Sequence, residues 1–365
     1  MDIFIKEVFE FLHNNPEPAF EEYKTAEFVA KHLKELGYKV IEKVGKTGVV
    51  GILDSGKKGP VLGLRADIDC LQFEVDGEIV NYHGCGHDGN MTMLLAAAKQ
   101  IIQNGIKEGK LYIIFQPGEE TLEGAQGVIE SGVIDDIDEI VGIHLQPKAE
   151  EEVGHASPRL MHKSYCSIEI NVIGRTCHAS LPHLGINATE AGALIINAVN
   201  TIRSDARSPY SCKATIFKAD GASRNSIQDK AFISFDLRAE TDDIMMELIS
   251  KLKNAAIYSA KSVGAEVEIV REVLCYAANY DDELSDIVKE ALIDVLGEGK
   301  VHDFTPATTS EDFHNYSAKL GAKASYISLG ADFHPYLHAY NATFDHSYLE
   351  KGAEILTNVA HRRLG

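Results

Sequence analysis

The strand-forming segments of this 365-residue chain are of two kinds, and this difference limits what the chain can fold into. Segments of the first kind are short, continuous apolar runs that alternate with helical patterns, and they lie at residues 38–41, 48–53, 61–65, 110–115 and 139–143. Such runs are typical of strands buried on both faces of a largely parallel sheet. Segments of the second kind alternate apolar and polar residues, beginning with Ser164 to Gly174. They indicate antiparallel strands with one solvated face, so we predict an α/β chain with two unlike domains.

Residues 163–274 carry a pattern of their own. Alternating strands and helices follow one another there in the order β-α-β-β-α-β, which is the ferredoxin-like split arrangement. After Asp281 the helices and buried strands of the first part resume. The sequence therefore predicts one domain of residues 1–162 and 275–365, interrupted by an inserted α+β domain of residues 163–274.

Composition argues against several classes of partner. The chain carries 35 Lys and Arg against 55 Asp and Glu, and this net charge of -20 argues against nucleic acid and against an anionic membrane surface. The N-terminal stretch lacks the basic start and continuous apolar core of a signal peptide. The chain also contains no uninterrupted run of about 18 apolar residues, the length that spans a membrane. The six cysteines are dispersed along a chain that needs no disulfides at this length. We therefore expect reduced thiols and a cytoplasmic protein.

The segment from His83 to Asn90 is the strongest candidate for chemistry. It places the thiol of Cys85 two residues before the imidazole of His87, with Asp88 directly after, among three glycines. Thiolate and imidazole are ligands for zinc and for several other transition metals, and glycines allow the backbone that a chelating pair at this spacing requires. The alternative is a glycine-rich turn with a buried cysteine and a solvated histidine.

Further donors lie mostly at the ends of predicted strands, where sites form in parallel sheets. They are Glu119 and Glu120 after the strand at 110–115, His144 after the strand at 139–143, and His338 near the C-terminus. Each has a plainer interpretation in isolation, as a surface acidic pair or as a histidine satisfied in the core. Of the two adjacent carboxylates, one could bind a metal and the other its bound water. Together with the Cys-His pair, the set exceeds what one tetrahedral ion needs and fits two ions about 3.5–4 Å apart.

An ordered set of motifs spans essentially the whole chain. The motifs are Leu64-Arg65-Ala66-Asp67-Ile68-Asp69, Cys85-Gly86-His87-Asp88-Gly89, Phe115-Gln116-Pro117-Gly118-Glu119-Glu120, Gly142-Ile143-His144, His178-Ala179-Ser180, Ser310-Glu311-Asp312-Phe313 and Leu337-His338. In this order the chain resembles the metal-dependent amidohydrolase family of aminoacylases, hippurate hydrolases, N-acetyldiaminopimelate deacetylases and indoleacetyl-amino-acid hydrolases. Each motif alone is modest, whereas the set is highly specific.

The resemblance implies a catalytic α/β domain of residues 1–162 and 275–365, with a zinc-peptidase-like bimetal centre. Residues 163–274 would then form a ferredoxin-like lid or dimerisation domain. By residue-to-residue match, the metal ligands would be Cys85, His87, Glu120, His144 and His338, with Glu119 as general base and Asp69 and Asp88 orienting ligand histidines. From the inserted domain, His178 would contact the substrate as oxyanion donor, and Asn225 and Arg238 would hold the substrate's carboxylate. A loop histidine and an arginine at a strand end also have plainer structural roles.

The function that the resemblance implies is hydrolysis of the amide bond of N-acyl amino acids, or of related small amides, by a water that two divalent ions activate. Zinc, manganese, cobalt and nickel all suit mixed nitrogen, oxygen and sulfur ligands. A dipeptidase or aminobenzoyl-glutamate-type peptidase is the nearest alternative, and a non-catalytic metal-binding relative is another. We expect a small-molecule substrate, and a homodimer or higher homo-oligomer formed through the inserted domain.

The sequence departs from the family pattern at four places. Asn90 stands where the family usually has a second histidine, and the segment from Leu71 to His83 is short. Thr176-Cys177 replaces the usual pair of glycines before the inserted-domain histidine, and Gln228 replaces a proline. Every expected ligand position is kept, so these departures bear on substrate choice more than on reaction type.

Overall fold

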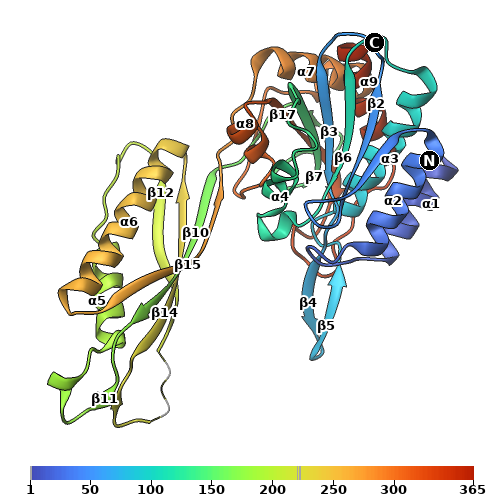
Figure 1. The fold of residues 1–365 in the computed structure, drawn as a ribbon. Coiled ribbons are helices and arrows are strands. Elements are labelled where there is room, and N and C mark those ends of the chain that lie inside the picture. Colours follow the sequence, from blue (N-terminus) through green and yellow to red (C-terminus); the bar gives the residue numbers. More distant parts are fainter. Residues whose placement is uncertain (1, 220, 222) are drawn as a thin grey trace. The chain divides into compact units, whose positions relative to one another are not determined.

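The computed structural model describes residues 2–219, 221 and 223–365, and it divides the chain into two compact units (Figure 1). The first unit comprises Met1–His162 and Ala278–Gly365, and the second comprises Lys163–Ala277. The chain leaves the first unit and returns to it at one point, because the Ala278 N–H donates to the His162 carbonyl, 3.0 Å away. Each unit has a hydrophobic core of its own.

The first unit is built on a seven-stranded sheet in the order β1-β2-β6-β3-β7-β17-β8. Its strands are β1 (Lys39–Val44), β2 (Gly48–Asp54), β3 (Val61–Asp67), β6 (Lys110–Gln116), β7 (Glu139–Pro147), β8 (Ala156–Ser157) and β17 (Lys323–Phe333). The central strands β6, β3, β7 and β17 run parallel, whereas β1, β2 and β8 are paired antiparallel at the edges. The predicted largely parallel sheet is thus found at the centre only. The turn between β1 and β2 is too short for the crossover that parallel pairing requires.

Helices cover both faces of this sheet (Figure 1). They are α1 (Ile3–Asn14), α2 (Tyr23–Leu36), α3 (His87–Asn104), α4 (Gly124–Glu130), α7 (Asp282–Leu296), α8 (His314–Leu320) and α9 (Tyr348–Leu364). The larger core joins one face of the sheet to α1, α2, α3, α7 and α9, and a smaller core joins the other face to α4 and α8. Helix α3 is buried along most of its length, so its first turn is fixed from all sides. No helix among the described residues has both the length and the apolar character needed to cross a membrane.

The short segment between Leu71 and His83 forms a β-hairpin that the sequence patterns left unassigned. Strands β4 (Leu71–Val75) and β5 (Glu78–Tyr82) pair antiparallel around Asp76 and Gly77, whose φ angles are 53° and 83°. Positive φ at both central residues matches a type I′ turn, for which Asp-Gly is a usual signal. The remaining short elements are η1 (Glu119–Thr121), η3 (Glu298–Lys300), and β9 (Leu160–Met161) paired with β16 (Thr305–Pro306).

The second unit is a four-stranded antiparallel sheet with two helices packed against it. The strand order is β12-β14-β10-β15, and the core lies between the sheet and helices α5 and α6. Along the chain the elements are β10 (Ser164–Ile173), α5 (Ala188–Val199), β12 (Tyr210–Lys218), β14 (Lys230–Ala239), α6 (Asp242–Ser262) and β15 (Glu266–Cys275). A separate two-stranded pair, β11 (Cys177–His178) with β13 (Ser226–Ile227), and η2 (Pro182–Leu184) complete the unit. Buried and half-exposed residues alternate along β10, as expected of a strand with one covered face.

Candidate metal centre

Gly86 sets the position of the Cys-His pair. It caps α3 with a φ of 83°, and the helix begins at His87, so Cys85 lies just before the helix and His87 in its first turn. The Ala- and Leu-rich sequence predicts a helix from Met91 to Gln103. The predicted start was wrong, because the helix begins at His87. Gly86 alone takes the left-handed conformation, which leaves the residues after it free to be helical.

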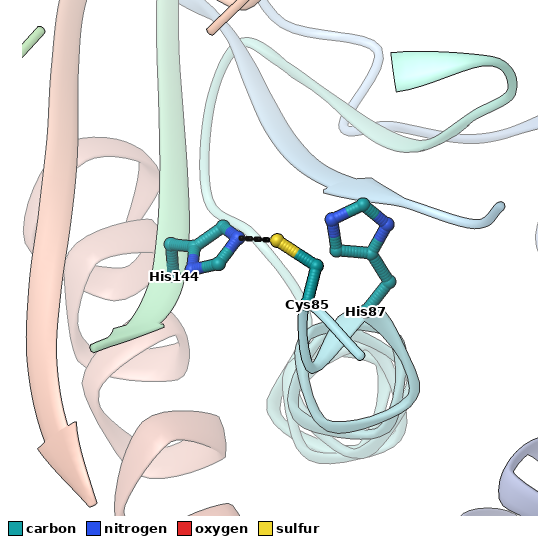
Figure 2. A group of neighbouring side chains, drawn as sticks. All are labelled: Cys85, His87 and His144. Carbon is teal, nitrogen blue, oxygen red and sulfur yellow. Dashed lines mark hydrogen bonds between the residues drawn. The ribbon is translucent and has the colours of Figure 1, made fainter. Parts of the chain in front are cut away.

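Cys85, His87 and His144 lie together beside β7, and Figure 2 shows their side chains facing one another. The Cys85 Sγ is 3.7 Å from the His144 Nε2, and one ligand atom of each of the three residues lies within 4.8 Å of the others. All three side chains are buried. The His144 Nδ1 lies 2.7 Å from the Leu145 carbonyl, so Nδ1 donates there and Nε2 keeps its lone pair toward Cys85.

Glu119 and Glu120 reach the same place from η1, directly after β6. The Glu120 Oε1 lies 3.9 Å from the His87 Nε2, and the Glu120 Oε2 lies 3.5 Å from the His338 Nε2. A Glu119 oxygen lies 4.0 Å from the His87 Nε2. Ligand atoms of Cys85, Glu120 and His338 are within 4.8 Å of one another, as are those of His87 and the two glutamates. The structure therefore brings together all five predicted ligands and the predicted base.

His338 lies at the solvent side of this cluster, since its side chain is 54% exposed. Its loop is held by hydrogen bonds to the segment that leads from the hairpin into α3. The His338 N–H donates to the Gly84 carbonyl at 2.8 Å, and the Tyr82 hydroxyl donates to the Ala342 carbonyl at 2.8 Å. The hairpin thus supports the loop of a candidate ligand.

The two aspartates predicted to orient ligand histidines have different partners. The Asp69 carboxylate lies 3.4 Å from the His87 Nδ1 and accepts from the Glu120 N–H at 2.9 Å, and the Asp69 carbonyl lies 3.0 Å from the same histidine nitrogen. Asp88 instead lies 2.7 Å from the His13 Nδ1 and accepts from the next backbone N–H. Successive side chains on a helix diverge by about 100°, so Asp88 points away from the direction of His87. The contacts of Asp88 do not match the role predicted for it.

Burial of so many donors disfavours their charged forms. It raises the pKa of Glu119 well above its usual range, with Glu311 and Glu120 adding to the effect. Burial likewise raises the pKa of Glu120 to about 8 and the pKa of Cys85 well above that of a free thiol. The His87 Nε2 and the Glu120 Oε1 are buried without a hydrogen-bond partner among the described residues. Bound cations would satisfy these atoms and stabilise the ionised donors.

Arg65 places a fixed positive charge beside the cluster, and the sequence patterns had given it no role. Its buried guanidinium donates to Asp67 at 2.8 Å, to Glu311 at 2.9 Å and to Asp312 at 3.1 Å. Burial would raise the pKa of Glu311, but Arg65 holds it below its usual range. The signal that was missed is a cation within a buried apolar strand, because such a residue is rarely left without acidic partners.

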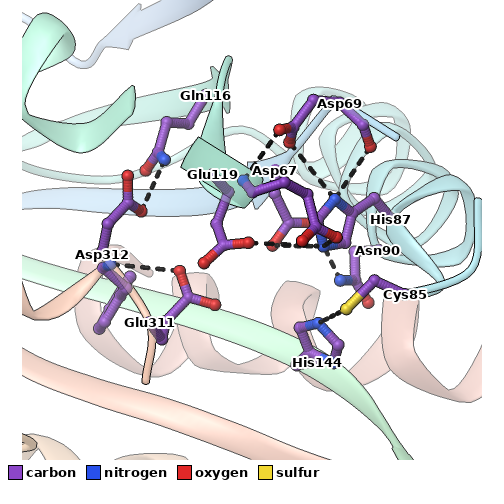
Figure 3. A network of polar contacts seen from close by, with 12 residues as sticks. Asp67, Asp69, Cys85, His87, Asn90, Gln116, Glu119, His144, Glu311 and Asp312 are labelled. Carbon is purple, nitrogen blue, oxygen red and sulfur yellow. Dashed lines mark hydrogen bonds and ion pairs between the residues drawn. The ribbon is translucent and has the colours of Figure 1, made fainter. Parts of the chain in front are cut away.

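Asn90 connects this acidic network to β7, as Figure 3 shows in part. Its side-chain Nδ2 donates to an Asp67 oxygen at 3.0 Å, and its side-chain Oδ1 accepts from the Leu145 N–H at 3.3 Å. A buried amide can serve both partners at once because it carries a donor and an acceptor. The side chain of Asn90 is therefore hydrogen-bonded through both its nitrogen and its oxygen beside the cluster.

The remaining predicted residues belong to the second unit. His178 and Asn225 are exposed neighbours there, with 3.5 Å between the His178 Nε2 and the Asn225 Nδ2, and the His178 Nδ1 lies 2.7 Å from the Ser180 hydroxyl. Arg238 lies near the far end of β14. It is roughly 25 Å from the first residue of that strand, Lys230, at ~3.3 Å per residue. There it donates to Asp236 at 3.1 Å. The structure brings His178 and Asn225 together and leaves Arg238 apart from them.

Residues 63–362 match the model of peptidase family M20/M25/M40. The chain belongs to this family. The hippurate hydrolase of Campylobacter jejuni is 33% identical over 97% of this chain and 94% of its own length. The N-acetyl-L-cysteine deacetylase of Bacillus subtilis is 30% identical over 97% of this chain and 86% of its own length. These matches confirm the resemblance seen in the motifs.

Solved structures share the fold of this M20 chain over nearly its whole length. The Bacillus subtilis YXEP protein, described as a dinuclear metal binding peptidase of the M20 family, aligns with a TM-score of 0.76 at 24% identity, covering 98% of this chain and 97% of that one. The aminobenzoyl-glutamate utilization protein of Klebsiella pneumoniae aligns with a TM-score of 0.79 at 22% identity, covering 98% and 94%. The mixed α/β fold class is thereby confirmed.

Removal of the Arg65 charge should destabilise the first unit strongly. We expect Arg65→Met to lower the free energy of unfolding by about 3–5 kcal/mol, because Asp67, Glu311 and Asp312 would stay buried without their counter-charge. Urea denaturation followed by circular dichroism measures this change. Arg207→Met is the matched control, since it breaks an ion pair that is exposed and should leave the unfolding midpoint unchanged. Equal effects of the two substitutions would contradict the expectation.

His162 and His314 form a buried pair, and because of it we expect the free energy of unfolding to fall in mild acid. Their ring nitrogens are 3.1 Å apart, and burial lowers the pKa of His162 to about 4 from its ordinary value of 6.5. Between these two values the unfolded chain binds a proton that the folded chain does not, so stability falls as the pH falls through this window. For His162 the loss between pH 7 and pH 5 is about 2 kcal/mol. Urea unfolding at both pH values should show a smaller difference in His162→Gln, and an unchanged difference would refute this account.

Proposed function

We propose that this chain hydrolyses the amide bond of N-acyl amino acids, or of related small amides, at a centre of two divalent metal ions. The observation that carries the proposal is the cluster in which one thiol, three imidazoles and two adjacent carboxylates converge from four separate segments. Two relatives are named for hippurate and N-acetyl-L-cysteine, which are both N-acyl amino acids, and a structural neighbour is described as dinuclear.

The donor set fits two divalent ions. Cys85, His87 and His144 offer one sulfur and two nitrogens, and Glu120 and His338 add an oxygen and a nitrogen beside the same sulfur. The unpartnered, buried His87 Nε2 and Glu120 Oε1 support this assignment. Such a mixture of ligands suits zinc, manganese, cobalt or nickel.

Two further groups of donors have similar spacing and are poorer places for an ion. Ligand atoms of Asp67, His144 and Glu311 lie within 4.8 Å of one another, as do those of Glu119, Glu311 and Asp312. Arg65, however, already donates to the three carboxylates of Asp67, Glu311 and Asp312. A second cation there would compete with a buried positive charge, so we assign the two ions to the groups around Cys85.

Glu119 is the residue that we assign to proton transfer. Ions bound at the neighbouring donors would lower the pKa of a water molecule and polarise the substrate's carbonyl group. Glu119, only 6% exposed, would take a proton from the attacking water and pass it to the leaving amine. Burial, which raises the pKa of Glu119, favours its protonated form between these two transfers.

In this proposal the second unit is a ferredoxin-like lid. His178 would donate a hydrogen bond to the developing oxyanion, and Asn225 would bind the substrate's carboxylate. The exposure of both side chains and their 3.5 Å separation support this pairing. Arg238 is the weaker candidate for the carboxylate, because Asp236 already occupies its guanidinium.

The second unit also offers an edge for dimerisation. Strand β12 is an edge of its sheet, and it exposes Ile216 and Phe217 by 41% and 40%. An unpaired edge with exposed apolar side chains is suited to pairing with a second copy of the chain. We therefore include a homodimer formed through this unit, and sedimentation of the purified protein as a monomer would refute it.

The proposal is tested by amine release from a panel of N-acetyl, N-benzoyl and longer N-acyl amino acids and dipeptides. We expect no turnover after chelation, and restored turnover of one acyl class after addition of zinc, manganese, cobalt or nickel, because the ions activate the water. Turnover of dipeptides alone would identify a dipeptidase instead. Silence across the panel with two ions bound per chain would contradict amide hydrolysis of this kind.

Glu119→Gln provides the internal test of the proton transfer. We expect kcat to fall by about 10²- to 10⁴-fold while both ions remain bound, because the amide cannot accept the proton. Metal content is measured by inductively coupled plasma mass spectrometry. Glu130→Gln, at the exposed end of α4, is the matched control and should keep its kcat. A Glu119→Gln protein with ordinary kcat would remove Glu119 from the mechanism.

A further inference from the structure

The loop between α1 and α2 reaches the backbone that carries the two adjacent glutamates. Glu22 occupies the N-cap position of α2, yet its side chain makes no capping hydrogen bond to that helix. It is instead fully buried, and its carboxylate accepts from the Gly118 N–H at 2.9 Å. Thr47 donates its hydroxyl to the other carboxylate oxygen. The Glu22 side chain thus binds a backbone amide that is distant in the chain and not one of its own helix.

Gly118 has a conformation and a position that few residues could share. Its φ is 64°, and a Cβ added there would meet the Phe20 ring at 2.5 Å. Phe20 itself has a φ of 63°, which is a rare conformation for a bulky residue and is found where surrounding contacts impose it. The loop before α2 therefore holds Gly118 through both a ring contact and a buried carboxylate.

The same short turn is held a second time, two residues further on. The Glu120 N–H donates to the Asp69 carboxylate at 2.9 Å. Asp69 is joined in turn to the loop before α2, because the Cys70 N–H donates to the Glu17 carbonyl at 2.9 Å. Two buried carboxylates from different segments thus fix the amides on either side of Glu119.

We propose that Glu22 is a positioning residue for the hydrolytic reaction, which acts by fixing the Gly118 backbone so that the Glu119 carboxylate stays in its catalytic place. The inference rests on the proposed function. Proton transfer requires the base to be held within a fraction of an ångström of its working position, and a misplacement of about 1 Å can cost 100-fold in rate. Glu22 touches neither substrate nor ions, so its effect is on turnover and not on substrate binding.

A neutral isostere separates the hydrogen bond from the charge. The side-chain carbonyl of glutamine can accept from the Gly118 N–H, and its amino group can donate to Thr47. Burial raises the pKa of Glu22, so a neutral side chain suits the same environment. Alanine, in contrast, leaves the Gly118 amide without its acceptor.

The experiment compares Glu22→Gln, Glu22→Ala and Thr47→Val on the metal-loaded enzyme, with Glu21→Ala at the exposed neighbouring position as control. We expect Glu22→Ala to lower kcat by about 10- to 100-fold with KM changed less than about 3-fold. Glu22→Gln and the control should stay within about 3-fold of the native kcat, and Thr47→Val should fall between. Equal losses for Gln and Ala, or a native kcat for Ala, would overturn the proposal.

Hydrogen–deuterium exchange gives a second readout that does not depend on turnover. A peptide covering residues 117–123 should exchange faster in Glu22→Ala than in the native protein or in Glu22→Gln, while peptides from α9 should not change. Unchanged exchange at 117–123 would overturn the proposal even if activity fell. If the native enzyme turned over no substrate of the panel, the proposed function would fail, and the exchange comparison would still decide whether Glu22 holds this turn.

Discussion

The buried guanidinium of Arg65 is the interaction on which the candidate site depends. Three carboxylates lie against it inside the first unit, and each would be costly to keep ionised there without a counter-charge. Arg65 extends from β3, whose neighbours are β6 and β7, the strands that lead to the glutamate pair and to His144. The positive charge is therefore carried by the central strand of the sheet. Three acidic side chains can therefore lie buried beside the candidate metal donors, because the charge of Arg65 is permanent.

The sequence predicted those features that depend on local signals. Apolar runs, and runs that alternate apolar and polar residues, were enough to predict the α/β class. The residues of each strand indicate by themselves how that strand is buried. The candidate ligands stood out because Cys85 and His87 are two residues apart in the chain and most of the other donors follow strands. The start of α3 was predicted too late in the chain. The glycines between His83 and Asn90 suggested one long turn, but the turn ends at Gly86 and the helix begins directly after it. The hairpin was missed although Asp76-Gly77 is a usual signal for it.

Contacts between distant segments could not be predicted in this way. Asp88 meets His13 across 75 positions, and Glu22 meets Gly118 across 96, so no local pattern pairs them. Asp88 follows a candidate ligand in sequence, which suggested that it orients this ligand, whereas its carboxylate lies against His13. Arg238 is the opposite case, because its partner Asp236 is two residues away on the same face of the strand. Opposite charges two residues apart on a strand are a local sequence signal, and this signal indicates that Asp236 binds the Arg238 guanidinium.

The N-terminal region supports the site although it lies outside the segment that matches the family model. That segment begins at residue 63 and contains every candidate ligand, whereas Glu22, His13 and strands β1 and β2 all precede it. A protein trimmed to the matched segment would keep each candidate ligand and lose Glu22, which binds the backbone just before Glu119 and Glu120. It would also expose the edge of β6, which β2 now covers. The segment that bears the family's signature thus begins inside the compact unit that surrounds the candidate site.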